Sequence, residues 1–361
     1  MKERFARILL LTSLPGLMFC IIPVHGTEFN LSWQLASVWL GGLAFTALLT
    51  GWWLRVFWLI CLAVTMIHFP PVYDAYISLI TVAVFLAAVE GFSRIDEEKA
   101  MDAICIAAIA LLCWMLAQRA GWATAWVGAQ SVGPFNPDAG GVFLALCLPA
   151  CLRGKWMLLT PFIVCGLVVS GTTTGAMAAL AGMAVYLYLT VADKRKIIAW
   201  GAALAVLAGV WFWKVDSLDN MVKCNRWIAW KHAAWSMRSE MLGRGLGSWE
   251  VVFPLLASGD TRLGTVTNEN GKIEMTNVFC QAHNEYVQAA FELGVQTFAL
   301  IGAFLIFVAV CILRKSVSAE VAAGMTALAI SCFGWHVFHI PPVALLGCAW
   351  LGMWQRREER V

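Results

Sequence analysis

Residues 101–117 of this chain read MDAICIAAIALLCWMLA, and Asp102 is the only charged side chain among them. Similar apolar runs recur along the 361-residue sequence, which is 61% hydrophobic and 13% charged. A soluble domain usually carries about 25% charged residues. A helix crosses the roughly 30 Å hydrocarbon core of a bilayer with about 20 mostly apolar residues. The sequence therefore predicts an all-α integral membrane protein in which residues 1–361 form a single polytopic membrane domain.

The apolar runs predict about twelve transmembrane helices. They lie near residues 8–22, 31–50, 54–68, 72–89, 101–117, 140–152, 156–170, 174–191, 197–213, 282–313, 321–337 and 343–354. The run at 282–313 is too long for one straight span, so its start is expected to project from the membrane. The first run is interpreted as a retained span, because the residues after it make a poor signal-peptide cleavage site.

The basic residues predict the orientation, because Lys and Arg in short loops mark the cytoplasmic side. With the N-terminus inside, every inner segment is basic, and the residues concerned are Lys2, Arg4, Arg7, Arg55, Arg94, Lys99, Arg153, Lys155, Lys194, Arg195, Lys196, Arg314, Lys315, Arg356, Arg357 and Arg360. The short outer loops hold only Arg119. We therefore expect both termini to be cytoplasmic. The six histidines then fall on the outer side, at positions 25, 68, 232, 283, 336 and 339.

One long outer segment, residues 214–281, is also rich in charge, which the rule tolerates in a long loop. It is predicted to be a large outer loop with short amphipathic helices. Within 225–241 three Trp residues alternate with basic ones, which fits either a helix in the membrane interface or a solvated loop. Cys224 and Cys280 bracket the loop, so a disulfide between them stays an open question. The net charge of +3 is too small to indicate nucleic-acid binding.

Two polar stretches interrupt the apolar pattern before and within this loop. Residues 133–138 read GPFNPD, a turn at a helix start with Asp138 as a candidate cap. Residues 226–230 read RWIAW and are followed by GRGLGSW at 243–249. Backbone N–H groups of a glycine-rich turn can bind an anion, and Arg244 would add charge. The alternative interpretation is a flexible turn that returns the chain to the membrane.

A third stretch, QAHNEYVQ at 281–288, forms a polar start to the run at 282–313. Spacings of three and four would place His283, Tyr286 and Val287 on one helix face. Polar groups that face the interior of a membrane bundle are usually functional.

Together the three stretches resemble the O-antigen ligase family of membrane glycosyltransferases. The family pattern is a Gly-x-Phe-x-Asn-Pro-like helix start, an Arg before an outer Trp-containing helix, a glycine-rich turn, and a His-Asn-Glu-Tyr box that opens a late span. This chain follows that order over residues 133–313. The resemblance implies transfer of a glycan from an undecaprenyl-diphosphate carrier to an acceptor glycolipid or protein on the periplasmic face of the bacterial inner membrane. The carrier-linked glycan, the acceptor and membrane lipids are then the partners, with no cofactor and no nucleotide sugar.

The resemblance also implies roles for individual residues. Arg226 occupies the position of the family Arg thought to hold the diphosphate. His283 occupies the position of the essential His thought to activate the acceptor. Arg244 is expected to assist in diphosphate binding. The expected supporting residues are Asn284, Glu285 and Tyr286.

The chemistry of these side chains agrees with that assignment. The planar fork of Arg suits phosphate and stabilises charge that develops on a leaving diphosphate. His is the usual base for an acceptor hydroxyl near neutral pH. The sequence contains no Asp-x-Asp pair to hold a divalent metal, so a metal-independent reaction is expected. Back-side attack would invert the anomeric carbon.

The chain departs from the family pattern at two places, and other functions stay open. Residues 170–174 read SGTTT, without the Arg that follows Ser in many members. Residues 335–341 read WHVFHIP, without the acidic residue typical of the protein-glycosylating branch. A polysaccharide polymerase of the same fold is one alternative, and a polytopic transporter or flippase is another. The Trp content and the pair His336 and His339 leave haem or metal handling as a third.

Overall fold

The computed structural model describes residues 2–19, 63–64, 73–122, 132, 135–192, 225–257, 260, 263 and 281–358. Within these residues every regular element is a helix, as expected. The α-helices are α1 (Lys2–Phe19), α4 (Tyr73–Ser93), α5 (Glu97–Arg119), α6 (Pro137–Cys151), α7 (Thr160–Ser170), α8 (Thr173–Thr190), α11 (Arg226–Ser236), α12 (Ser248–Leu256), α13 (Glu285–Leu293), α14 (Gln296–Leu313), α15 (Ala319–Gly334) and α16 (Pro341–Glu358). Two 3-10 helices are η1 (Gly154–Leu159) and η3 (Val337–His339).

Three of the described helices, α5, α8 and α14, are long and apolar enough to cross a membrane. Shorter apolar helices cover residues 78–93, 137–151, 154–170 and 319–334. The predicted spans at 31–50 and 197–213, and all of 54–68 except residues 63–64, lie outside the described residues. Length and composition therefore support a membrane protein, and the number of spans stays a prediction.

The centre of the bundle is α6, which packs against α5, α7, α8, α15 and α16. All of its residues from Ala139 to Cys151 are buried. Glycines permit close packing around it, since Gly182 of α8 faces the backbone of Ala323 on α15. Gly324 of α15 lies directly against the ring of Trp350 on α16. Small residues at helix contacts are the usual means of close approach in membrane bundles.

The apolar run at 282–313 forms two helices, because the chain breaks at Gly294 between α13 and α14. Gly294 has φ 95°, a backbone conformation that is unfavourable for residues other than glycine. A Cβ at this position would lie 2.6 Å from the carbonyl carbon of Leu242. The start of the run is thus separate from the long helix, as its length suggested, and it forms a helix of its own whose end contacts Leu242.

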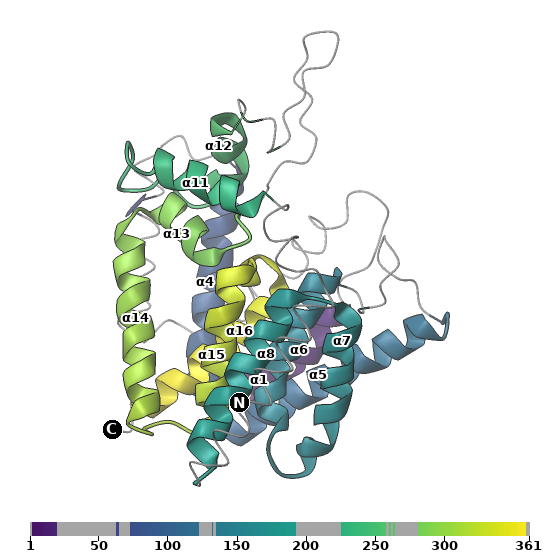
Figure 1. The fold of residues 1–361 in the computed structure, drawn as a ribbon. Coiled ribbons are helices and arrows are strands. Elements are labelled where there is room, and N and C mark those ends of the chain that lie inside the picture. The colour runs from purple at the N-terminus through teal and green to yellow at the C-terminus, as the bar shows by residue number, and fades with distance from the viewer. Residues whose placement is uncertain are drawn as a thin grey trace.

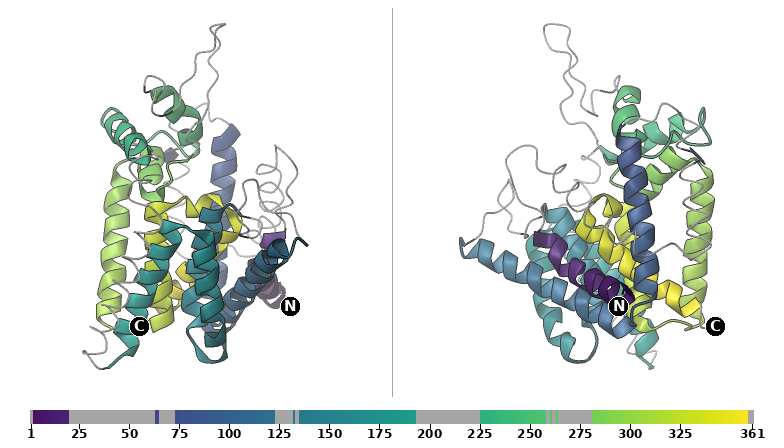
Figure 2. Two further views of the ribbon diagram at one scale, coloured as in Figure 1. Left: turned by 45° about the vertical axis from the view of Figure 1, so that its right-hand side comes forward. Right: turned by 180° about the vertical axis from the view of Figure 1, so that it is seen from behind.

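The short helices α11, α12 and α13 form a cap at one end of the bundle, next to the ends of α14 and α4 (Figures 1 and 2). The cap has its own small core. Trp249 of α12 stacks on Phe253 with ring centroids 4.3 Å apart and meets Phe291 of α13 edge-on at 5.1 Å. Ala229 and Ala233 of α11 are fully buried in the same cluster. Helices α11 and α12 both lie within the predicted outer loop at 214–281.

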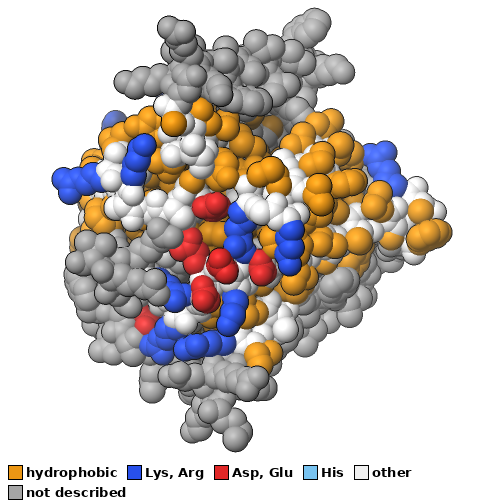
Figure 3. All heavy atoms as spheres, turned by 90° about the horizontal axis from the view of Figure 1, so that it is seen from below, with side chains coloured by type: hydrophobic (Ala, Val, Ile, Leu, Met, Phe, Trp, Pro, Cys, Tyr) orange, Lys and Arg blue, Asp and Glu red, His pale blue; other side chains and the backbone are white. Residues whose placement is uncertain are grey.

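The opposite end of the bundle is charged, with acidic side chains near its centre and Lys and Arg around them (Figure 3). Arg153 pairs with Asp102 at 2.5 Å, and the indole N–H of Trp156 donates to the same carboxylate at 2.7 Å. The Ser318 hydroxyl donates to Glu97 at 2.6 Å. Both chain ends lie toward this face (Figures 1 and 2). Basic residues that the sequence assigns to the cytoplasm are therefore found opposite the cap.

Candidate functional site

Trp335, directly after α15, lies where the cap meets the bundle. The guanidinium of Arg226, at the start of α11, lies over its ring at 5.6 Å from the centroid. The ring of His283, from the loop before α13, is 4.8 Å from that of Trp335. Two side chains singled out from separate sequence motifs are therefore neighbours across one buried indole.

Arg226 is held by groups from two helices of the bundle. Its Nη1–H donates to the carbonyl oxygen of Gly334 at 3.3 Å, and its Nη2 lies 3.7 Å from the carboxylate of Asp138. The sequence suggested Asp138 as the cap of α6, but that interpretation is wrong. The N-cap residue of α6 is Asn136, whose Oδ1 accepts from the N–H of Ala139 at 2.8 Å. Because Asn136 caps the helix, the carboxylate of Asp138 can face the guanidinium.

The segment 170–174, where the sequence departs from the family pattern, reaches the same point. The hydroxyl of Thr174 donates to the carbonyl of Gly334 at 3.3 Å, the group that Arg226 also contacts. A neutral hydroxyl therefore lies beside the Arg226 contact, in the segment where many family members carry a cation.

His283 is not on the helix that the sequence predicted for it. Helix α13 begins at Glu285, and its N-cap residue is Asn284, whose Oδ1 accepts from the N–H groups of Tyr286 and Val287 at 3.0 and 3.1 Å. His283 directly precedes Asn284 and has φ 52°, in the left-handed region. Such a conformation costs a residue other than glycine about 1–3 kcal/mol. The predicted shared face with Tyr286 and Val287 is therefore wrong, because a left-handed turn sets the direction of the imidazole.

The imidazole of His283 lies among aromatic and basic groups. The ring of His336 stands edge-on to it at 4.8 Å. Burial, and then the charge of Arg226, lower the pKa of His283 from 6.5 to about 3. Burial, together with His283, His339 and Arg226, lowers the pKa of His336 well below 6.5. Both imidazoles are thus neutral at pH 7, and a neutral imidazole carries a lone pair on one of its ring nitrogens.

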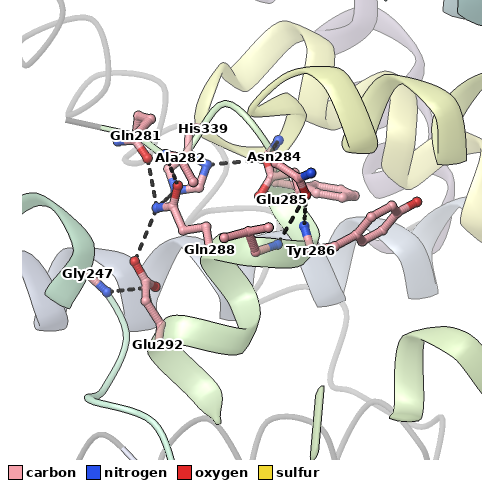
Figure 4. Close-up of polar contacts among 11 residues, drawn as sticks. Gly247, Gln281, Ala282, Asn284, Glu285, Tyr286, Gln288, Glu292 and His339 are labelled. Atoms are coloured by element: carbon pink, nitrogen blue, oxygen red, sulfur yellow. Dashed lines mark hydrogen bonds and ion pairs between the residues drawn. The ribbon is translucent and has the colours of Figure 1, made fainter. Parts of the chain in front are cut away.

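Glu285 and Tyr286, two of the predicted supporting residues, attach α13 to its surroundings (Figure 4). The carboxylate of Glu285 accepts from the N–H of Phe338 at 2.6 Å and lies 3.3 Å from Nδ1 of His339. The hydroxyl of Tyr286 donates to the carbonyl of Ala329 on α15 at 2.7 Å. These contacts link α13 to η3 and to α15, on either side of Trp335.

The glycine-rich turn at 243–247 binds a carboxyl group that belongs to the chain itself. The carboxylate of buried Glu292 accepts from the N–H groups of Gly247 at 3.0 Å and Trp249 at 3.4 Å (Figure 4). Its backbone carbonyl accepts from the N–H groups of Arg244 and Gly245 at 3.0 and 2.9 Å. Backbone groups that the sequence suggested for an external anion are therefore engaged internally.

The side chain of Arg244 also has partners within the cap. It pairs with Glu240 at 3.2 Å and donates to the carbonyl of Ser236 at 3.4 Å. Its guanidinium lies over the ring of Phe291 at 5.2 Å. Among the described residues no contact joins it to the group around Trp335, so its part in diphosphate binding stays a prediction.

Sequence reasoning did not assign Trp335 or His336 to the reaction site. The signal was the dense Trp and His pattern at 335–339, directly after an apolar run. From the sequence, this stretch served only as a departure from the protein-glycosylating branch and as a reason to consider haem or metal handling. In the described part of the chain no three His, Cys, Asp or Glu side chains gather as metal ligands. The rings of His336 and His339 instead lie 6.2 Å apart, the first against His283 and the second against Glu285. Cys224 and Cys280 lie outside the described residues, so their disulfide stays untested.

The sequence matches the family model described as O-antigen ligase over residues 158–302. The matched region begins before α7 and ends within α14, so it includes Arg226, Arg244 and His283. No curated protein matches the chain. The family match over residues 158–302, the motif order and the apolar helices together support an O-antigen ligase assignment, and with it a glycosyl-transferring membrane enzyme of the O-antigen ligase or polymerase type.

Proposed function

We propose that this protein transfers a glycan from an undecaprenyl-diphosphate carrier to an acceptor on the periplasmic face of the bacterial inner membrane. The observation that carries the proposal is the convergence of Arg226 and His283 on Trp335. In this proposal about twelve spans cross the membrane, both termini are cytoplasmic, and residues 214–281 form the periplasmic loop. The cap then lies at the outer membrane boundary, where the diphosphate of a lipid carrier would also lie.

Arg226 is the proposed ligand of the diphosphate. Departure of the diphosphate places negative charge on its oxygens, and a fixed guanidinium stabilises that charge as it develops. Asp138, 3.7 Å from the guanidinium, holds it in place before substrate binds. Arg244 is proposed to approach the distal part of the diphosphate.

His283 is the proposed general base. Its imidazole is neutral at pH 7, because burial and Arg226 lower its pKa to about 3. A bound diphosphate would neutralise Arg226, which raises the pKa and makes the imidazole a stronger base. His283 accepts the acceptor's proton as the new bond to the anomeric carbon forms and the bond to phosphate oxygen breaks. A single displacement of this kind inverts the anomeric carbon and needs no metal.

The test is transfer by the purified full-length protein in proteoliposomes, supplied with an undecaprenyl-diphosphate glycan and a glycolipid acceptor. Arg226→Ala and His283→Ala should each lower the rate about 100-fold or more, the usual effect of removing one charge-stabilising or proton-transferring group. Matched controls are Arg238→Ala, which changes an exposed Arg just after α11, and His232→Ala, which changes a His paired with Asp260. Both controls should keep near-normal rates, and a chelator should have no effect.

Full activity in Arg226→Ala or His283→Ala would refute the assigned roles, and retained anomeric configuration would refute the single displacement. The same assay addresses the alternatives. A polymerase of the same fold would extend carrier-linked glycans into longer chains without the glycolipid acceptor. A transporter or flippase would move the carrier-linked glycan across the bilayer without changing its covalent structure.

A further inference from the structure

A partly buried network of polar side chains beneath the site has no part in the chemistry proposed above. It runs from Glu285 through His339 and Gln288 to Glu292 and ends at Gly247, at the start of α12 (Figure 4). The Glu285 carboxylate lies 3.3 Å from Nδ1 of His339, and Nε2 of His339 lies 3.0 Å from Nε2 of Gln288. The same amide nitrogen donates to Oε1 of Gln281 at 2.8 Å and to Glu292 at 3.1 Å. This network of hydrogen bonds therefore connects η3, α13 and α12.

Gln288 also connects this network to the loop that carries His283. Its Oε1 accepts from the N–H of Ala282 at 3.0 Å. The carbonyl of Ala282 accepts from the indole N–H of Trp230 at 2.7 Å. The residue before His283 is thus held by α13 on one side and by α11 on the other. These two hydrogen bonds precede His283, and the N-cap bonds of Asn284 follow it. Together they keep His283 in its left-handed conformation.

The protonation state of His339 decides whether Gln288 can keep its orientation. The amide nitrogen of Gln288 carries two hydrogens, which Gln281, Glu292 and His339 share, and it accepts none. Nε2 of His339 can therefore only be an acceptor toward it, and the ring is then neutral with its Nδ1–H directed to Glu285. A charged His339 would bring two N–H donors face to face at 3.0 Å. Turning the amide of Gln288 relieves that repulsion. It also removes the acceptor of the Ala282 N–H and places a carbonyl against the carboxylate of Glu292.

Carboxylates near His339 favour its charged form. In the described part of the chain, the titratable groups that face it are Glu285 and Glu292 on α13, Glu250 on α12, and His336 beside it. Burial lowers the pKa of His339, but the carboxylates outweigh burial and raise the pKa above 6.5. The charged form therefore dominates below that raised pKa, and the neutral form dominates above it.

We propose that Gln288 and His339 are positioning residues for His283, and that protonation of His339 releases Ala282 and loosens the His283 loop. The catalytic consequence rests on the proposed function, since a loosened base would slow transfer. The coupling itself is a property of the protein without substrate. It can therefore be measured whatever the substrate proves to be.

The measurement is hydrogen exchange by mass spectrometry on the full chain in lipid nanodiscs, between about pH 6 and 9. Exchange at imidazole C2 gives the pKa of His339, and amide exchange corrected for its intrinsic pH dependence gives the protection of Ala282. We expect that protection to fall about tenfold as His339 becomes charged, the effect of losing one hydrogen bond. His339→Asn, which keeps a donor for Glu285 but does not titrate, should remove the pH dependence. His232→Asn should behave like the wild type.

A second variant tests the proposal independently, in case His339→Asn misfolds. Gln288→Met keeps the length of the side chain and should leave Ala282 weakly protected at every pH. Constant protection in the wild type, or an equal pH-dependent loss in His339→Asn, would overturn the proposal. If the exchange pattern appears but no glycan is ever transferred, the coupling stands and the proposed function falls. If glycan is transferred but the exchange pattern is absent, the proposed function stands and the coupling falls.

Discussion

At the scale of single residues, Arg226 controls how readily His283 can take a proton. Its positive charge is the second cause, after burial, of the low pKa of His283. Arg226→Gln removes that charge and keeps a polar side chain, so the pKa of His283 should rise from about 3. It should stay below 6.5, because burial is unchanged. Imidazole C2 exchange, resolved for each histidine, measures the shift.

The control for this prediction is Arg238→Gln, which removes an equal charge from an exposed position near the end of α11. It should leave the pKa of His283 unchanged. Added inorganic pyrophosphate should raise the pKa in the wild type and have little effect in Arg226→Gln, since Arg226 is the proposed ligand. Equal pKa values in the wild type and Arg226→Gln would mean that Arg226 lies too far from His283 in solution to act on it.

Sequence motifs identified Arg226 and His283 but not the residue that brings them together. Each belongs to a local pattern, a cation before a Trp-containing helix and a His beside a helix cap. Trp335 belongs to a third segment, and its role depends on tertiary packing between α15, α11 and the loop before α13. The left-handed φ of His283 was equally invisible, because periodicity assumes a helical backbone that begins only at Glu285.

At the scale of elements, the cap depends on contact between two backbone turns. Gly243 has φ 91°, and a Cβ there would lie 2.4 Å from the backbone nitrogen of Gly294. Gly243→Ala should therefore separate the turn from the α13–α14 junction and lower stability by at least ~1 kcal/mol. Thermal unfolding of the purified protein measures this effect. The matched control is Gly302→Ala in α14, where an added Cβ meets nothing within 4 Å and alanine favours the helix. A variant at Gly243 as stable as this control would show that the contact contributes nothing.

Apolar runs predicted most described helices to within a few residues, because burial or lipid contact leaves a direct mark on composition. The division between α13 and α14 was harder to predict. Gly294 is one glycine among many in this chain, and only its contact with Leu242 shows why the chain breaks there. The partner of the glycine-rich turn was hidden for the same reason. Glu292 reads as an isolated acid near an apolar run, yet its carboxylate binds Gly247 and Trp249 across the cap.

At the scale of the whole molecule, the two ends of the bundle differ in chemistry. The cap end carries the Arg226, His283 and Trp335 group, whereas the other end carries ion pairs such as Arg153 with Asp102. The proposed reaction takes its donor from one leaflet, so it requires the reactive groups to lie on one side only. Basic residues in short loops retain a segment in the cytoplasm, so the charged end should face inward and the cap outward.

This orientation can be measured with reporters that work in one compartment only. Green fluorescent protein fused after residue 361 should fluoresce, because it folds in the cytoplasm. Alkaline phosphatase inserted between residues 264 and 277 should be active, because it folds only outside the inner membrane. The charge rule gives the physical reason, since every predicted inner segment is basic. A dark terminal fusion with an active phosphatase at the same end would mean that one span was miscounted. An inactive phosphatase in the loop would place the Arg226 and His283 pair in the cytoplasm, away from any periplasmic acceptor, and would exclude the proposed reaction.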